Sequence, residues 1–270
     1  MNLLLRFGKR WQKSVRWMLG WYRTQVEVPF LLRHGKRLRH LERYARRIPF
    51  IERREYSQNG EDGIFEAIFT MAGTTNKYFV EFGAEDGVQS NTRYLQKHKG
   101  WTGLLMDGGH ENPEINLHRE FITAENIEQL FKKYNVPEEF DLLSIDVDGN
   151  DYWIWKAVTA YRPRVVCIEY NACIPFSPAV TIPYAADFSW DKTDYYGASL
   201  SALRILGRKK GYTLVGTDPC GVNAFFVRDD VAAGKFDPGP VEEIYRPAAF
   251  KGKPGNAHPK DPSGRSWAQV

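Results

Sequence analysis

The chain has 270 residues, of which 43% are hydrophobic and 26% charged, so it can bury the core of one large α/β domain and is not intrinsically disordered. Its formal net charge of +4 conceals an asymmetry: residues 1–54 hold 15 Lys and Arg against 3 Asp and Glu, and the remainder holds 22 against 30. The three cysteines, Cys167, Cys173 and Cys220, are too few and too irregularly spaced for a disulfide framework or a thiolate zinc site, which indicates a reducing, intracellular compartment.

Residues 1–54 are predicted to form a basic, amphipathic helical region. Placed on a helix, six apolar side chains fall within an arc of about 80°, and six basic side chains fall on the other side. The apolar set is Leu4, Phe7, Trp11, Val15, Met18 and Tyr22, and the basic set is Arg6, Lys9, Arg10, Lys13, Arg16 and Arg23. Such a helix is typical of contact with an anionic membrane surface, and it fits equally well packing on the chain's own domain or on a protein partner through residues 1–50.

The apolar run at residues 3–5 is too short for a signal sequence or a membrane span. We therefore expect a cytoplasmic protein that can lie peripherally at the inner face of the membrane. A nucleic-acid partner is disfavoured, because the acidic remainder of the chain would not extend the basic surface.

Residues 55–232 alternate between strand and helix patterns. Strands are predicted at 78–82, 102–106, 120–122, 141–147 and 164–170, and helices at 57–70, 90–98, 127–134 and 199–210, with Thr123 and Asn126 capping the third helix. This alternation predicts an α/β fold with a mostly parallel, doubly wound sheet. Two further strands, 212–216 and 224–228, flank the turn Asp218-Pro219-Cys220-Gly221, which predicts a C-terminal antiparallel hairpin.

Two segments lie outside this alternation. The long loop 174–196 carries six aromatic residues at the place where such a fold would put a substrate lid. The six are Phe176, Tyr184, Phe188, Trp190, Tyr195 and Tyr196. Residues 233–270 are rich in proline and glycine with little apolar periodicity, so we expect a loosely ordered C-terminal tail.

The first predicted strand ends in Glu81 and is followed by Gly83 and Gly87. The spacing Gly-x-x-x-Gly is not the dinucleotide fingerprint Gly-x-Gly-x-x-Gly, and Glu85 and Asp86 would repel a pyrophosphate. An acidic glycine loop suits the sulfonium and ammonium groups of S-adenosylmethionine. The alternative is an ordinary turn between a strand and a helix.

Asp107 ends the second strand and is followed by Gly108. In a doubly wound sheet this position faces the ribose, and a carboxylate there can accept hydrogen bonds from the ribose hydroxyls. The end of the third strand, with Glu125, would border the adenine. A turn aspartate before two glycines is the structural alternative for Asp107.

Carboxylates follow the fourth and fifth strands. Asp146, Asp148 and Asp151 lie beside a buried apolar run, where like charges repel unless a cation or a proton compensates. Asp146, Glu169 and Asn171 are predicted to converge on a Mg²⁺ site, which would lower the pKa of a substrate hydroxyl. Without a metal, Asp146 or Glu169 would act as general base, with Asp148 in the same catalytic group. The remaining alternative is structural capping of loops.

Four segments together resemble the FkbM-type methyltransferases: Tyr56-Ser57-Gln58-Asn59-Gly60-Glu61-Asp62, Phe79-Val80-Glu81-Phe82-Gly83-Ala84-Glu85-Asp86-Gly87, Leu143-Ser144-Ile145-Asp146-Val147-Asp148-Gly149 and Ile168-Glu169-Tyr170-Asn171. The resemblance covers about residues 55–230. It implies a Rossmann-like methyltransferase fold, S-adenosylmethionine as donor and O-methylation, often of sugar or polyketide hydroxyls. It also makes Glu81, Gly83 and Asp107 cofactor contacts and puts Asp146 beside the methyl group. The chain departs from the family loop Asp-x-Gly-Ala-Asn-x-Gly at Glu81 and at Glu85-Asp86.

We therefore predict an O-methyltransferase domain at 55–232 that uses S-adenosylmethionine, with or without Mg²⁺, on a small-molecule or glycan hydroxyl. One rival is a glycosyltransferase that holds a metal and a nucleotide sugar through Asp146-Val147-Asp148. The other is a non-catalytic, membrane-associated binding module.

Overall fold

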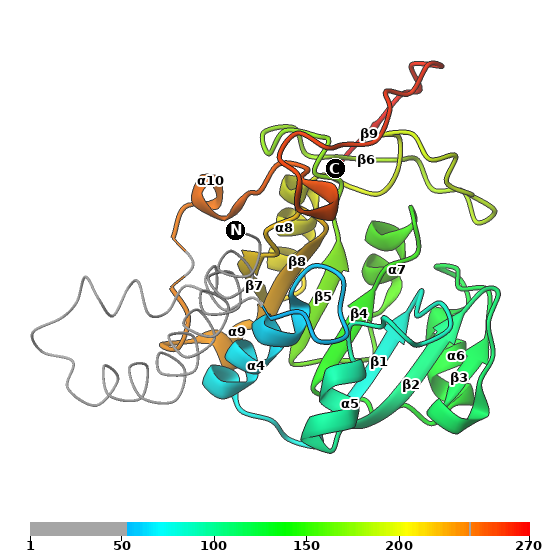
Figure 1. Ribbon diagram of the computed structural model, residues 1–270, viewed down its shortest axis with the longest axis vertical. Helices are drawn as coiled ribbons and strands as arrows, with labels where there is room; N and C mark the ends of the chain where they lie inside the picture. The colour runs from blue at the N-terminus through cyan, green and yellow to red at the C-terminus, as the bar shows by residue number, and fades with distance from the viewer. Residues whose placement is uncertain (1–52, 238) are drawn as a thin grey trace, which may run out of the picture.

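The computed structural model describes residues 53–237 and 239–270, and the predicted N-terminal helix lies outside them. Seven strands form one sheet in the order β3-β2-β1-β4-β5-β8-β7 (Figure 1). Their bounds are β1 Tyr78–Phe82, β2 Thr102–Asp107, β3 Leu117–Arg119, β4 Leu142–Ile145, β5 Val165–Glu169, β7 Tyr212–Thr217 and β8 Asn223–Arg228. The first five strands are parallel, and β8 pairs antiparallel with both β5 and β7. This order and the closing hairpin confirm the predicted Rossmann-like methyltransferase fold.

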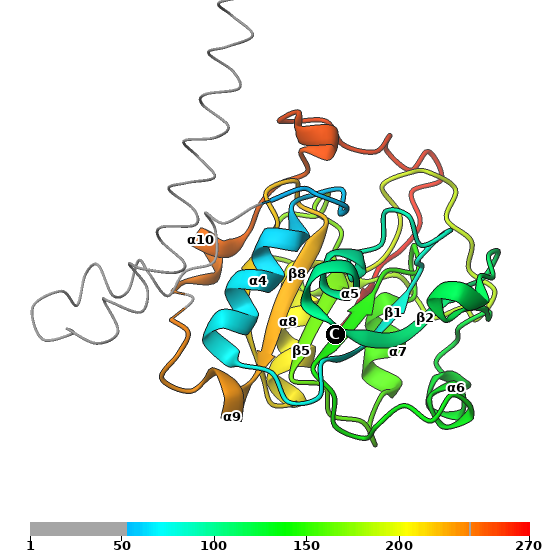
Figure 2. The same ribbon diagram turned by 60° about the horizontal axis from the view of Figure 1, so that its bottom comes forward.

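Helices cover both faces of the sheet (Figure 2). On one face lie α4 (Glu61–Ala72) and α5 (Arg93–Lys99), and on the other α6 (Ile127–Lys133), α7 (Asp151–Ala157) and α8 (Leu200–Lys209). Side chains alternate along β1. Phe79 packs in the core under α4 and α5, and Val80 and Phe82 pack in the core under α6, α7 and α8. A strand buried on both faces reads as a continuous apolar run, which is why β1 is predicted to the residue.

Two elements of the parallel α/β part differ from the sequence predictions. The third strand is Leu117–Arg119 and not 120–122, because Leu117 is fully buried and pairs with Leu105, whereas Phe121 is 61% exposed. Helix α7 was not predicted, because its seven residues include three aromatic side chains and too few turns to show a period. The predicted cap residues of α6 bond to each other in the turn before the helix: Thr123 accepts the N–H of Asn126 at 3.3 Å, and Asn126 accepts the N–H of Thr123 at 2.8 Å. Asn126 holds the N-cap position, and its side chain caps no N–H group of the helix.

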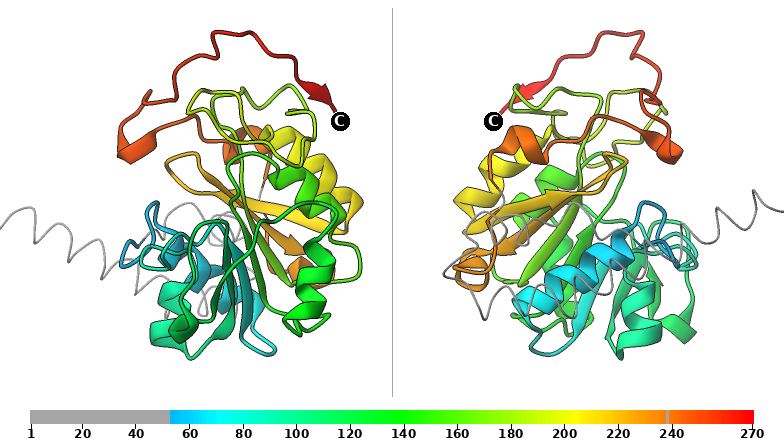
Figure 3. Two further views of the ribbon diagram at one scale, coloured as in Figure 1. Left: turned by 90° about the vertical axis from the view of Figure 1, so that its right-hand side faces the viewer. Right: turned by 60° about the vertical axis from the view of Figure 1, so that its left-hand side comes forward.

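The C-terminal segment is more ordered than predicted. Strand β9 (Ala268–Gln269) pairs antiparallel with β6 (Val180–Thr181), which lies inside the long loop. Arg265 forms an ion pair with Asp191 at 2.6 Å. The long loop and the C-terminal segment lie above the same end of the sheet in Figures 1 and 3. The loop is held over the end of β5 by Asn171, which donates to two of its carbonyls. The proline and glycine content of this segment predicts little order, because its stabilising contacts are with β6 and Asp191, which are distant in sequence.

Three short helices, α9 (Asp229–Ala232), α10 (Val241–Ile244) and the 3-10 helix Phe250–Gly252, follow the hairpin, and another 3-10 helix, Pro113–Ile115, precedes β3. Within residues 53–237 and 239–270, no helix has the length and apolar content needed to cross a bilayer.

Candidate active site

Three carboxylates meet where β4 and β5 end. Asp146 follows the last residue of β4 and Glu169 is the last residue of β5, and the pairing of Ile145 with Ile168 puts these ends side by side. One oxygen from each of Asp146, Asp148 and Glu169 lies within 4.8 Å of the others. We call these three residues the acid cluster.

The acid cluster is electrostatically strained. Burial raises the pKa of Asp146 well above its usual range, and the nearby Asp151 and Asp148 carboxylates raise it further. Burial also raises the pKa of Glu169 well above its usual range, with Asp146 as the main neighbouring charge. The Oε2 atom of Glu169 has no hydrogen-bond partner within the described part of the chain. A proton or a cation at this point would relieve the repulsion.

The loop after β4 is shaped by Asp151, a residue that its sequence context did not mark as part of the site. This buried carboxylate accepts the backbone N–H groups of Val147 and Gly149, both at 3.0 Å. Asp148 lies between them with φ +55°, a left-handed conformation that is uncommon outside glycine. Burial raises the pKa of Asp151 to about 7. Asp151 thus fixes the loop conformation in which Asp148 lies near Asp146 and Glu169.

Gly83 is required by its packing within the chain. Its φ is +67°, and a Cβ at this position would lie 1.7 Å from the carbonyl oxygen of Asp146. The loop after β1 therefore rests directly on the backbone that carries the acid cluster. Gly87 also has a positive φ, +77°, and a Cβ there would meet the Cδ1 of Ile115 at 2.4 Å.

Glu81, predicted as a cofactor contact, is bonded to the residues at the end of the loop that follows β1. Its carboxylate is buried and accepts the N–H groups of Asn91 (2.7 Å) and Thr92 (3.0 Å) and the Thr92 hydroxyl (2.5 Å). Burial raises the pKa of Glu81 to about 7, although these hydrogen bonds lower it. Both oxygens are thus engaged with the residues just before α5, so Glu81 positions the glycine loop.

Asp107 ends β2 beside the glycine loop. Its Oδ2 accepts the N–H of Glu85 at 3.0 Å, and its Oδ1 accepts the N–H groups of Gly109 and His110 at 2.8 and 3.0 Å. The carboxylate also contacts the Nδ1 of His110 at 2.9 Å, and this hydrogen bond raises the pKa of the imidazole. Gly108 is exposed, and a Cβ there would meet nothing closer than 3.9 Å, so its backbone leaves this edge open.

The loop 174–196 contacts two of the predicted site segments. The Tyr184 hydroxyl donates to Glu125, lowering the pKa of that exposed carboxyl, and it accepts the N–H of Ala124 at 3.2 Å. Phe188 packs on Gly149, where a Cβ would lie 2.4 Å from its ring. Asn150 donates to the carbonyl of Ala185 at 2.8 Å. This part of the loop therefore borders the acid cluster.

The other aromatic residues of the loop pack elsewhere. Trp190 lies against His258 with ring centroids 4.6 Å apart, and Tyr195 against Trp267 at 4.8 Å. Both partners belong to the C-terminal segment, so these side chains anchor the loop.

Asn171 has a different place from the one predicted. Its side-chain nitrogen donates to the carbonyls of Asp194 and Tyr196 at 2.9 and 2.8 Å, and its Oδ1 accepts the N–H of Cys173 at 2.9 Å. The amide is therefore used in holding the loop. Of the predicted metal set, Asp146 and Glu169 are brought together, and Asp148 joins them as the third acid, whereas the Asn171 side chain turns to the loop.

Comparisons with known proteins give only distant likenesses. No protein-family model and no curated protein matches the chain. Among solved structures, an S-adenosylmethionine-dependent methyltransferase from Clostridium acetobutylicum ATCC 824 has a TM-score of 0.37 and 11% identity, covering 64% of this chain and 92% of its own. The mitomycin 7-O-methyltransferase MmcR has a TM-score of 0.31 and 16% identity, covering 79% and 67%. TnmH has a TM-score of 0.34 and 18% identity, covering 76% and 68%.

At these scores the likenesses carry no argument about activity. The sheet order and the residues themselves define the class: a Rossmann-like methyltransferase fold with an acidic site at the carboxyl edge of its parallel strands.

Proposed function

We propose that the chain is an S-adenosylmethionine-dependent O-methyltransferase of the FkbM type, acting on a hydroxyl of a sugar or glycan. The observation that carries this proposal is the convergence of acids at the carboxyl edge of the sheet. Asp107 ends β2, and the acid cluster follows β4 and β5 on the other side of the glycine loop. In open α/β sheets, ligands bind outside the carboxyl ends of the strands where the strand order reverses, here between β1 and β4.

The residues present fit this donor. Within the described residues, Asp107 Oδ2 accepts one hydrogen bond, from Glu85, and so keeps a lone pair for a ribose hydroxyl. Burial raises the pKa of Asp148 most, and the charges of Glu85 and Asp107 raise it further, so both carboxylates lie close enough to repel that of Asp148. This concentration of negative charge favours a sulfonium and an ammonium group and opposes a pyrophosphate. Gly83 and Glu81 support the site by fixing the loop beneath the donor.

When bound, S-adenosylmethionine supplies an electrophilic methyl group. The chain's own part is to orient the acceptor hydroxyl and to take its proton at a carboxylate oxygen of Asp146 or Glu169. Burial and the charges of neighbouring carboxylates raise both pKa values, which favours one shared proton on the pair. The carboxylate that stays ionised is the one that takes the acceptor's proton. We expect the loop 174–196 to orient the acceptor, because its Phe188 packs on Gly149, the residue after Asp148, and its Tyr184 is hydrogen-bonded to Glu125 and Ala124.

Two measurements test the proposal. In a thermal-shift assay, S-adenosylhomocysteine should stabilise the protein, since a ligand that binds only the folded state raises the melting temperature. A panel of sugar and glycan acceptors with radiolabelled donor then identifies the acceptor class. Stabilisation by a nucleoside diphosphate with Mn²⁺ in place of S-adenosylhomocysteine would overturn the assignment.

A metal-dependent reaction is the second candidate, because the acid cluster has the oxygen donors that Mg²⁺ and Mn²⁺ prefer. It includes both acids of Asp146-Val147-Asp148, as a glycosyltransferase that binds a nucleotide sugar would require. Dialysis against EDTA separates the alternatives. Unimpaired methyl transfer excludes the metal, and loss of transfer that Mg²⁺ restores assigns the metal to methyl transfer.

A further inference from the structure

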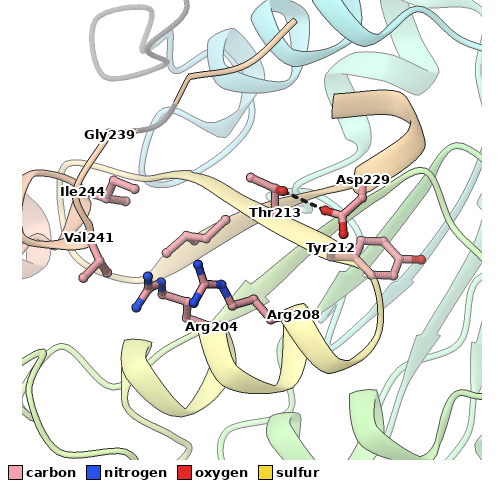
Figure 4. Close-up of a pocket in the computed structure, with 9 residues that line it drawn as sticks. Arg204, Arg208, Tyr212, Thr213, Asp229, Gly239, Val241 and Ile244 are labelled. Carbon is pink, nitrogen blue, oxygen red and sulfur yellow. Dashed lines mark hydrogen bonds between the residues drawn. The ribbon is translucent and has the colours of Figure 1, made fainter. Parts of the chain in front are cut away.

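A pocket of about 210 Å³ lies between α8, the start of β7 and α10 (Figure 4). Its basic side is made by Arg204 and Arg208 of α8, and its apolar side by Leu214, Val241 and Ile244. Strand β8 is antiparallel to β5 and to β7, so β7 runs parallel to β5. The first residues of β7 therefore lie at the opposite end of the sheet from the acid cluster. The pocket is separate from the proposed methyl-transfer site.

The two guanidinium groups of this pocket form no ion pair with an acid of the described residues, although Asp229 lines the same pocket. Neither guanidinium group makes a hydrogen bond or an ion pair within residues 53–237 and 239–270, although Arg204 is half-buried. Every other arginine of the described part that is buried or half-buried does have such a partner: Arg53, Arg93, Arg164, Arg228, Arg246 and Arg265. Arg204 and Arg208 are four residues apart on one helix, a spacing at which like charges repel each other. An anion between them would remove that repulsion.

The remaining walls restrict the shape and charge of the ligand. Asp229 also lines the pocket, and its Oδ1 accepts the Thr213 hydroxyl at 2.7 Å. Figure 4 shows this pair drawn with both arginines around the same space. The apolar wall consists of three buried aliphatic residues, Leu214, Val241 and Ile244. Two guanidinium groups match a dianion with several terminal oxygens, and the apolar wall matches a short hydrocarbon attached to it.

We propose that this pocket binds a small, soluble phosphate monoester, with the phosphate on Arg204 and Arg208 and the ester group on the apolar wall. The volume accommodates a phosphate with a short chain.

Isothermal titration calorimetry of the full-length protein at fixed ionic strength tests the site with n-butyl phosphate, inorganic phosphate and pentanoate. We expect n-butyl phosphate to bind about fivefold tighter than inorganic phosphate because of its buried methylenes. It should bind about tenfold tighter than pentanoate, a monoanion that leaves one arginine unpaired. Equal binding of all three probes, or no binding, would overturn the proposal. Tighter binding of dihexanoyl phosphatidic acid would overturn the soluble ester in favour of a lipid headgroup.

The double variant Arg204→Gln/Arg208→Gln should lose n-butyl phosphate affinity by about tenfold or more. Lys209→Gln is the matched control, because Lys209 is exposed on the same helix and does not line the pocket. Its affinity should stay within about twofold of wild type. An equal loss in both proteins would show only general charge attraction and would contradict the site.

Chemical labelling of the unaltered protein gives a test that does not depend on how the variants fold. n-Butyl phosphate should protect Arg204 and Arg208 from phenylglyoxal, as read by mass spectrometry. Arg119 and Arg162, which are exposed and lie outside the pocket, serve as internal controls and should label equally with and without the probe. Unchanged labelling of Arg204 and Arg208 would exclude binding at this pocket.

Discussion

Gly83 and Asp146 touch through their backbones: a Cβ on Gly83 would lie 1.7 Å from the carbonyl oxygen of Asp146. The contact joins the loop after β1, which lies beneath the proposed donor, to the first residue of the acid cluster. A side chain added at Gly83 must therefore displace either the glycine loop or Asp146. The two halves of the proposed reaction, donor binding and proton removal, are connected at this point.

Gly83→Ala is expected to destabilise the fold by about 2–4 kcal/mol, because it adds a clash with backbone to the cost of a positive φ. Urea unfolding measures the loss, and calorimetry with S-adenosylhomocysteine should show weakened binding. Gly108→Ala is the matched control, since its Cβ would make only an ordinary contact at 3.9 Å. If Gly83→Ala were as stable as Gly108→Ala, the backbone contact would not constrain the loop.

Asp146→Asn should reduce methyl transfer by about 100-fold or more while changing S-adenosylhomocysteine affinity by less than about tenfold, roughly 1.4 kcal/mol. The amide keeps the size of the carboxyl but cannot take the acceptor's proton. Transfer with saturating donor and acceptor measures the first effect. Glu138→Gln, an exposed acid before β4, is the control and should retain activity. Full activity in Asp146→Asn would remove Asp146 from the reaction.

The parallel strands could be predicted from sequence because they are short apolar runs bounded by turns, and the acids follow them directly. β1 is predicted to the residue, and Asp146 and Glu169 meet as adjacent strand ends must. Neighbouring parallel strands end at the same edge of the sheet, so the order of the motifs along the chain is enough to place these acids.

Side-chain direction could not be predicted in the same way. Asn171 follows β5 two residues after Glu169, yet it turns toward carbonyls of a loop more than twenty residues on. Glu81 reaches Asn91 and Thr92, and the role of Asp151 depends on a left-handed Asp148. Such contacts depend on the packed tertiary structure, which no local pattern encodes.

Glu81 should make folding stability depend on pH. Its pKa is about 7 in the folded protein against 4.5 for the ordinary group, so between these values the folded state binds more protons than the unfolded chain. Stability from this group is therefore lost as the pH rises from about 4.5 to about 7, by up to about 3 kcal/mol. Glu81→Gln cannot titrate and should show a correspondingly flatter profile in urea unfolding from pH 4.5 to 8. An unchanged slope would mean that Glu81 is ionised throughout.

The basic N-terminal region predicts binding to anionic membranes. Full-length protein should float with vesicles that contain phosphatidylserine and stay behind with neutral vesicles. Reversing three charges, with Lys9→Glu, Arg10→Glu and Lys13→Glu, should abolish flotation, because each basic residue near an anionic surface contributes about 1 kcal/mol. Lys209→Gln, on the folded domain, should float like wild type. Equal flotation of the charge-reversed protein would assign the region to packing on its own domain or on a partner.

Tyr184 should matter for the acceptor and not for the donor. Its hydroxyl connects the loop 174–196 to Glu125 and Ala124 at the start of α6, and its ring lies 6.0 Å from that of Trp153. Tyr184→Phe keeps the ring and removes both hydrogen bonds, so the loop is expected to order less well over the acid cluster. We expect the KM for the acceptor to rise about three- to tenfold, with kcat within about twofold and donor affinity unchanged. Tyr134→Phe, which removes a hydrogen bond to Glu120 away from the loop, is the control. A fall in kcat with an unchanged acceptor KM would instead place the Tyr184 hydroxyl in the chemical step.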